Sequence, residues 1–283
     1  MVALQSISDP QEVIITNNSF TKFWQKRLAD ARDIPFVKLS LQITVTLIPL
    51  AVLMYLPVNE YAWWFAAALY TYFNNFVFKG SFGLMLHCTS HRPFFKAPYK
   101  YLNHYLPWII GPLFGQTPET YFSHHLGMHH SENNLEDDLS STMLYQRDSF
   151  GDFMMYFASF FFMGLYYLIK YFDLRNRKKL RDKVIRGELV FFLFCLILSF
   201  VNWPATLVVF ILPWFISRFI MMLGNWTQHA FIDFDEPENC YKNSITCINT
   251  PYNHKCWNDG YHINHHLKPA LHWTQYPKHF IDN

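Results

Sequence analysis

The stretch "LQITVTLIPLAVLMYL" at residues 41–56 forms most of an uncharged segment, Leu39–Leu56. A helix of about 20 mainly apolar residues can cross a bilayer, because a helix satisfies its own backbone hydrogen bonds. After "PVNE" comes a second uncharged segment, Tyr61–Phe78, in which Trp63 and Trp64 occupy positions typical of the membrane interface. Together the two segments predict a transmembrane helical hairpin with a short turn.

A second hairpin is predicted further along the chain. The uncharged run Leu189–Ser217 is too long for one crossing, and it contains "NWP" at 202–204. Because proline ends or begins a helix, we place the two legs at Val184–Val201 and Pro204–Leu223. The segment Tyr99–Gly115 is broken by His104, Pro107, Gly111 and Pro112, and we expect it to be shallow in the membrane.

The segment Phe153–Ile169 is long enough to cross, but its surroundings argue against a crossing. If it crossed, the basic run "RNRKKLRDK" at 175–183 would lie opposite the N-terminus, against the positive-inside tendency. The histidines before and after it would also be separated by about 30 Å of hydrocarbon. We therefore expect residues 153–172 to form a helix in the cytosolic interface. The predicted fold is all-α, with four transmembrane helices in two hairpins, interfacial helices and a cytosolic helical cap.

The composition agrees with an integral membrane protein that faces a reducing compartment. Charged residues make up 16% of the 283 residues, below the roughly 25% usual in soluble domains. The net charge of +2 gives no global basic field for nucleic acid. The five cysteines are scattered without a C-x2-C pair, which argues against a disulfide framework. The first thirty residues lack the apolar core of a signal peptide, so we expect a cytosolic start.

Histidines gather in four short motifs: "HCTSH" (87–91), "HHLGMHH" (124–130), "NWTQH" (225–229) and "YHINHH" (261–266). Helical residues three or four apart share a face, so such pairs can bind one ion or two adjacent ions. His125 and His129 have this spacing, whereas His130 lies about 100° further round the helix and can serve a second metal. The candidate metal ligands are His87, His91, His125, His129, His130, Asn225, His229, His262, His265 and His266.

The number of imidazoles favours two metal ions. Imidazole suits zinc, copper, iron and nickel, and nine histidines match two ions with four or five ligands each. No H-E-x2-H motif supplies the general base of a zinc protease, and haem uses at most two axial histidines. Two non-haem irons at a membrane surface are the simplest interpretation. Zinc could replace iron in overproduced protein, because affinity rises from iron to zinc along the divalent series.

The order H-x3-H, H-x3-H-H and H-x2-H-H around two hairpins resembles the membrane fatty acid desaturase and hydroxylase superfamily. The resemblance covers residues 35–275, which leaves 1–34 as a cytosolic N-terminal segment and 276–283 as a C-terminal tail. It implies a di-iron centre that uses O2 to oxidise an unactivated C–H bond of a fatty acyl or related lipid chain. It also implies that His229 is a ligand and that Asn225 reaches iron through water.

Several outcomes are compatible with this resemblance. We expect desaturation first, with hydroxylation second and oxidative decarboxylation or alkyne formation as further alternatives. A membrane haem or metal carrier is the non-enzymatic alternative. No haem-binding H-P-G-G motif and no cysteine cluster is present, so electrons must come from a separate donor of the ferredoxin or cytochrome b5 type. The basic run at 175–183 could dock that donor or anionic lipid, but we interpret it as a topological anchor.

Four residues near the histidine motifs are candidates for orienting the ligands from behind. They are His124, Asp137, Asp138 and Asp259. His124 also leaves a second register open for the second box, which we resolve in favour of His125 because of its spacing to His129. The two neighbouring aspartates could instead lie on a solvated turn.

Overall fold

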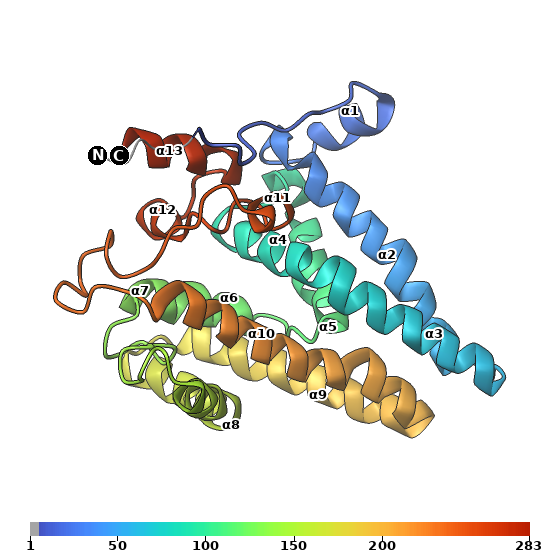
Figure 1. Cartoon of the computed structure of the whole chain (residues 1–283). Coiled ribbons are helices and arrows are strands. Elements are labelled where there is room, and N and C mark those ends of the chain that lie inside the picture. Colours follow the sequence, from blue (N-terminus) through green and yellow to red (C-terminus); the bar gives the residue numbers. More distant parts are fainter. Residues whose placement is uncertain (1–5) are drawn as a thin grey trace.

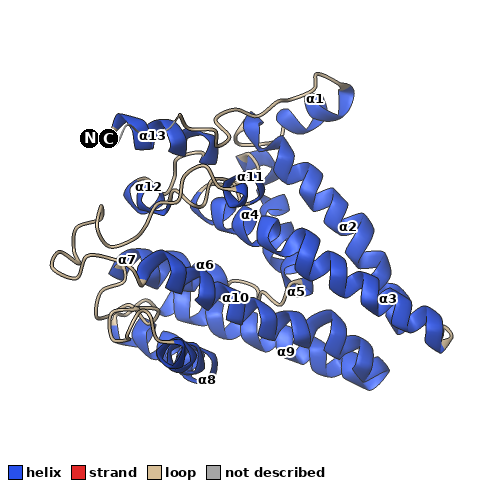
Figure 2. Ribbon diagram, in the orientation of Figure 1, coloured by secondary structure: helices blue, strands red, loops and turns tan. Residues whose placement is uncertain are grey.

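The computed structural model describes residues 6–283, and apart from two isolated β-bridges all regular secondary structure in that range is helical (Figure 2). The predicted all-α class is confirmed. Within the same range, three helical stretches are long and apolar enough to cross a membrane, and they are Ala31–Tyr55, Phe150–Leu174 and Lys178–His229.

The first predicted hairpin consists of α2 (Ile34–Tyr55) and α3 (Glu60–Tyr72), which run side by side in opposite directions (Figure 1). Its turn is fixed locally: Asn59 caps α3 by accepting a hydrogen bond from the Ala62 N–H at 2.9 Å. The Trp63 indole N–H donates to the Met54 carbonyl at 2.9 Å, which ties the two legs together.

The second leg of this hairpin is longer than the apolar segment that predicted it. From α3 the chain continues through the π-helix η2 (Phe73–Phe78) into α4 (Lys79–His91) without leaving the helical path. His87 follows Phe78 by nine residues, so at about 1.5 Å per residue it lies about 13 Å beyond the predicted span. The first histidine motif therefore lies at the end of a continuous helical stretch, residues 60–91.

The second hairpin consists of α9 (Lys178–Thr206), the π-helix η6 (Leu207–Ile211) and α10 (Leu212–His229). The chain reverses at Asn202, whose φ of −158° and ψ of 96° break the helix. The Asn202 side chain accepts a hydrogen bond from the Ala205 N–H at 3.1 Å and so caps the returning leg. The break falls inside the "NWP" motif, as the sequence predicted. Asn202 also donates to the Met54 carbonyl at 3.1 Å, which joins the tips of the two hairpins.

Helix α8 (Phe150–Leu174) takes a different direction from the hairpins. In Figure 1 it is seen nearly end-on, whereas α2, α3, α9 and α10 lie along the plane of the picture. It packs on α10 through aromatic contacts, including Phe153 with Trp226 at 5.6 Å and Phe157 with Phe219 at 5.1 Å between ring centroids. Helix α8 therefore lies across the direction that the two hairpins share (Figure 1).

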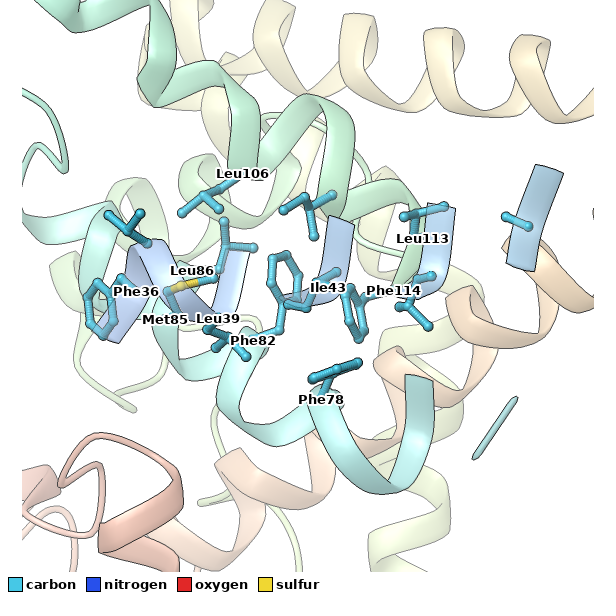
Figure 3. Close-up of a cluster of buried hydrophobic side chains, with 14 of the residues drawn as sticks. Phe36, Leu39, Ile43, Phe78, Phe82, Met85, Leu86, Leu106, Leu113 and Phe114 are labelled. Carbon is cyan, nitrogen blue, oxygen red and sulfur yellow. The ribbon is translucent and has the colours of Figure 1, made fainter. Parts of the chain in front are cut away.

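A hydrophobic core holds α4 in place against α2 (Figure 3). Phe36 and Ile43 of α2 and Phe82 of α4 are at most 1% exposed. The Phe82 ring stacks on Phe114 at 4.3 Å between centroids. Phe114 follows a run of short helices: η3 (Ala97–His104), η4 (Leu106–Ile110) and α5 (Gly111–Leu113). Burial of each large side chain contributes about 1.5–3 kcal/mol to the stability of the fold. This core therefore holds in place the helical stretch that carries the first histidine motif.

Short elements gather at the end of the molecule opposite the hairpin tips (Figure 1). They are α1 (Ser19–Gln25), η1 (Ala31–Asp33), α6 (Thr120–His124), η5 (His125–His129), α7 (His130–Glu132), α11 (Pro251–Lys255), α12 (His262–Leu267), η7 (Trp273–Gln275) and α13 (Tyr276–Asp282). The N-terminal segment is bound to this cap, because the Tyr261 hydroxyl donates to Asp9 at 2.6 Å. The cap contains the second and fourth histidine motifs, and the first and third lie at the ends of α4 and α10 that face it.

Candidate metal centre

All nine predicted histidine ligands come together at the cap, in two groups. Each histidine offers one ring nitrogen, and within a group these nitrogens all lie within 4.8 Å of one another. The five-imidazole group is His87, His91, His125, His130 and His265, and the four-imidazole group is His129, His229, His262 and His266. Both groups are largely buried, and each draws its members from at least three segments that are distant in sequence.

The spacing within each group suits ligands of one ion. In the five-imidazole group, the Nε2 atom of His265 lies 2.9 Å from that of His87 and 3.0 Å from that of His130. His125 Nε2 lies 2.9 Å from His91 Nε2 and 3.1 Å from His130 Nε2. Two ligand nitrogens about 2.1 Å from a metal and at right angles are about 3.0 Å apart. The observed separations therefore match neighbouring ligands around a metal.

Hydrogen bonds behind the rings determine which nitrogen faces the centre. The Asn243 carbonyl accepts a hydrogen bond at 2.8 Å from His229 Nδ1, which must therefore carry the proton. His129 Nδ1 lies 2.7 Å from the Asp138 carboxylate, and His87 Nδ1 lies 3.2 Å from that of Asp259. In His229, whose Nδ1 carries the proton, the lone pair lies on Nε2, and this nitrogen faces His262 Nε2 at 3.0 Å. Ring nitrogens that converge at such distances suit the ligands of a cation between them, so the residues fit a metal.

Burial keeps the imidazoles in the form that binds metals. Loss of solvent lowers the pKa of His229 to about 3, with the neighbouring His129 as a further cause. The same effect, together with the charge of His87 and His129, lowers the pKa of His91 to about 3. These rings are therefore neutral at pH 7, and a neutral imidazole is the metal ligand.

The second motif differs in local geometry from the prediction. The sequence paired His125 with His129 at α-helical spacing, but residues 125–129 form the π-helix η5. A π-turn bonds residue i to i+5, so His125 shares its group with His130, and His129 enters the other group. The adjacent residues His129 and His130 lie in different groups.

A sequence model described as fatty acid desaturase matches residues 17–281. The chain belongs to the fatty acid desaturase family. No curated protein and no solved structure matches it. The match extends on both sides of the predicted 35–275 domain and includes nearly all of α13. As a desaturase-family member the chain is an oxidoreductase of lipid chains in membranes, and its family normally uses iron.

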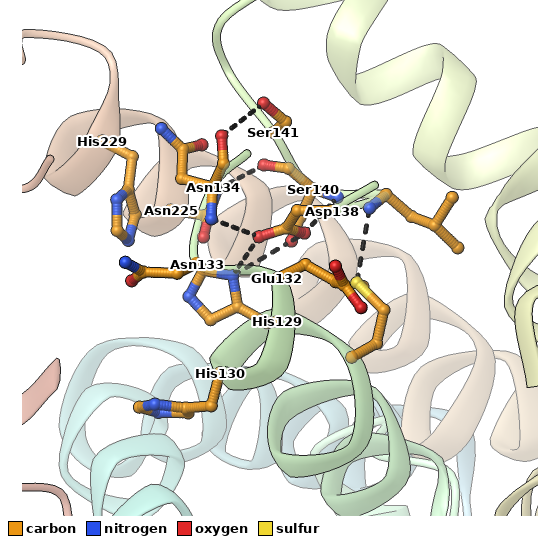
Figure 4. A network of polar contacts seen from close by, with 12 residues as sticks. His129, His130, Glu132, Asn133, Asn134, Asp138, Ser140, Ser141, Asn225 and His229 are labelled. Atoms are coloured by element: carbon orange, nitrogen blue, oxygen red, sulfur yellow. Dashed lines mark hydrogen bonds and ion pairs between the residues drawn. The ribbon is translucent and has the colours of Figure 1, made fainter. Parts of the chain in front are cut away.

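Asp138 supports the four-imidazole group of this desaturase-family chain (Figure 4). One carboxylate oxygen accepts hydrogen bonds from His129 Nδ1 at 2.7 Å and from the Asn134 N–H at 2.9 Å. The other oxygen accepts from the Ser140 N–H at 2.8 Å and from the Ser140 hydroxyl at 2.6 Å. Asn133 and Asn134 have φ of 52° and 61°, a left-handed turn that asparagine tolerates better than most residues. This turn folds Asp138 back onto the motif.

Asp259 has the corresponding position behind the five-imidazole group. Besides His87 it contacts Gln228 Nε2 at 2.9 Å and the Tyr252 hydroxyl at 2.6 Å, and both groups donate to it. It therefore connects the first motif to the residue before His229 and to the segment before the last motif. Neither donor was predicted from the sequence, although the position of Gln228 inside "NWTQH" was a usable signal.

Other residues behind the ligands carried no sequence signal. The Tyr276 hydroxyl lies 3.2 Å from His265 Nδ1, although residues 276–283 were predicted to be a tail. Asn243 supports His229 through its backbone carbonyl, which any residue would supply. Tyr121 stacks on His125 with centroids 5.4 Å apart and an angle of 11° between the rings.

Three predicted residues lie elsewhere. Asp137 is exposed and forms an ion pair at 2.6 Å with Arg175. His124 belongs to neither group; its ring packs against Phe160, and burial lowers its pKa to about 4. Asn225 donates through Nδ2 to the Ser140 carbonyl at 2.8 Å and to the Tyr156 hydroxyl at 2.7 Å, which leaves its amide oxygen as the atom able to meet a ligand water.

Proposed function

We propose that this chain binds two iron ions, one in each imidazole group, and uses O2 to desaturate a fatty acyl or related lipid chain. The observation that carries the proposal is the convergence of nine buried imidazoles into groups of five and four, with Nε2 atoms about 3 Å apart. Membership of the desaturase family supplies the reaction class.

The bound irons would supply activation of O2 and removal of hydrogen from an unactivated C–H bond. For desaturation, a –CH2–CH2– unit, O2, two electrons and two protons give –CH=CH– and two molecules of water. The chain's own residues hold and orient the ligands: Asp138 and Asp259 fix His129 and His87 through their Nδ1 protons. Such partners typically account for about 10–100-fold in metal affinity or activity.

The two electrons must come from a separate donor protein. All five cysteines are free, and no group of them in residues 6–283 could hold an iron–sulfur cluster. We propose a ferredoxin or a cytochrome b5 as the donor class. The basic run at 175–183 is partly committed to internal ion pairs, since Arg175 pairs with Asp137 and Arg181 with Asp173. That commitment favours its interpretation as an anchor of the cap.

We further propose four membrane crossings, with the metal centre on the cytosolic side. Ligands from α4, η5, α10 and α12 meet in one place, which requires an even number of crossings between any two of these segments. The steep crossing of α8 over the second hairpin supports its placement along the interface rather than through the bilayer (Figure 1).

The test is lipid profiling of a host that expresses the chain together with a ferredoxin or cytochrome b5 reductase system. We expect new double bonds in fatty acyl chains and about two irons per purified chain. A His265→Ala variant should make no double bonds and should lose the iron of the five-imidazole group. Zinc-loaded protein should be inactive, and iron loading should restore activity. Hydroxylated chains would identify a hydroxylase instead. Iron-loaded protein that consumes no O2 with any lipid fraction of the host would contradict the proposal.

A further inference from the structure

A cavity of about 190 Å³ lies beside the five-imidazole group, between α6, α8, α9 and α10. Most of its wall is apolar and aromatic, and it includes Phe160, Phe161, Leu165, Phe192 and Trp214. Tyr121 and His124 also line it. Because Tyr121 stacks directly on His125, the cavity begins next to a proposed metal ligand.

One part of the wall is charged although it lies among apolar side chains. Glu188 and Arg218 line the cavity there, with side chains 7% and 16% exposed. The Thr117 hydroxyl donates to Glu188 Oε1 at 2.5 Å. Arg218 reaches the same oxygen and the Gly115 carbonyl, each at 3.4 Å, which is long for a hydrogen bond.

Among the described residues, these contacts use only part of the hydrogen-bonding capacity of Glu188 and Arg218. A guanidinium carries five N–H donors and a carboxylate has about four acceptor sites. Within residues 6–283, Arg218 donates only the two long bonds, and Glu188 accepts only through Oε1. An occupant that both accepts from Arg218 and donates to Glu188 would complete the pair. A carboxylate would meet the negative charge of Glu188, and a hydrocarbon would leave both groups unsatisfied.

The size of the cavity restricts the occupant further. A cavity of about 150 Å³ holds benzene, and pockets for drug-sized ligands are about 300–1,000 Å³. A space of this size takes a segment of a lipid chain together with a small polar group. On the basis of the function proposed above, we propose that the cavity binds a lipid chain bearing a neutral hydroxyl or amide group, which Glu188 and Arg218 recognise.

Trp214 allows binding to be measured without metal or turnover. A dibrominated octadecanol quenches the fluorescence of nearby tryptophans. The difference in quenching between the unsubstituted protein and its Trp214→Phe variant gives the part of the signal that comes from the cavity rather than from the other tryptophans. Octadecanol, octadecanamide, octadecanoate and octadecane then compete with this probe. We expect the alcohol and the amide to compete at about tenfold lower concentration than the acid and the alkane, because only they satisfy both charged groups.

Two changes separate the polar group from the cavity itself. The double variant Glu188→Leu/Arg218→Met removes both charges and so leaves no lone buried charge; the preference should fall to within about twofold. Thr117→Val removes only the hydroxyl that holds Glu188 and should weaken the preference, which keeps the test open if the double variant does not fold. Gly164→Leu projects into the apolar wall beside Phe160 and should weaken all four competitors together.

Equal competition by all four lipids in the unsubstituted protein would overturn the proposal. An undiminished preference for the alcohol and the amide in both Glu188→Leu/Arg218→Met and Thr117→Val would also overturn it. Absence of any Trp214-dependent quenching would also overturn it. Because the binding assay needs no iron, it is independent of the oxidation assay. A clear preference for the alcohol and amide without new double bonds in cells would disprove the proposed function and leave the recognition intact.

Discussion

Asp138→Asn provides a selective test of the two-site arrangement, because this carboxylate contacts only the four-imidazole group. Asp138 is 3% exposed and accepts four hydrogen bonds, among them those from His129 Nδ1 and the Ser140 N–H. An asparagine can accept through one atom only. If its oxygen stays with His129, its NH2 group faces the Ser140 N–H, and a buried donor loses its acceptor.

The magnitude follows from these contacts. A buried donor without an acceptor costs about 1–3 kcal/mol, and the His129 bond also loses its charge assistance. Replacement of such a partner behind a metal-binding histidine lowers metal affinity by about 10–100-fold, which is about 1.4–2.7 kcal/mol. We expect this loss at one site of the two, since the five-imidazole group depends on Asp259 instead.

The assay is an anaerobic titration of metal-free protein with buffered Fe²⁺, followed by iron counting and O2 consumption. The unsubstituted protein should fill two sites, and Asp138→Asn should fill one normally and the other about 10–100-fold more weakly. Asp137→Asn is the matched control: it makes the same chemical change one residue away, on a carboxylate paired with Arg175 at the surface. Equal weakening of both sites, or normal filling of both, would refute the reasoning.

Three further predictions follow from the same contacts. His124→Ala should retain two irons, because His124 belongs to neither group; loss of one iron on counting would assign it as a ligand. Single cysteines at Asp148 and Asn176, exposed positions flanking α8, should be labelled from the same side of sealed vesicles, and labelling from opposite sides would exclude the four-crossing topology. Metal-free protein should melt at a lower temperature at pH 5 than at pH 7.5. Burial lowers the folded-state pKa of His229 to about 3, so at pH 5 this ring is neutral in the folded state and protonated in the unfolded state. The unfolded state therefore binds more protons as the pH falls from about 6.5, which lowers the stability of the folded state. Equal melting temperatures would show that buried imidazoles do not limit acid stability.

The features that the sequence predicted are those that local patterns determine. The length of the uncharged segments predicted the first hairpin. The "NWP" motif predicted the reversal at Asn202, because a helix break depends on nearby residues. The histidine motifs likewise identified the residues that form the two imidazole groups. Tyr276 and the Glu188–Arg218 pair were out of reach, since their roles depend on which distant segments pack beside them.

The partition of ligands between the two groups shows most clearly where spacing stops being informative. An H-x3-H-H motif fits an α-helix, in which His125 pairs with His129, and equally a π-turn, in which His125 pairs with His130. Packing selects the second: a side chain at Gly127 would lie 2.6 Å from Leu180, so this turn is pressed against the start of α9. Arg177 also donates a hydrogen bond to the Gly127 carbonyl. The histidine motifs thus specify which residues reach the centre, while the turn packed against α9 places His129 in one group and His125 and His130 in the other.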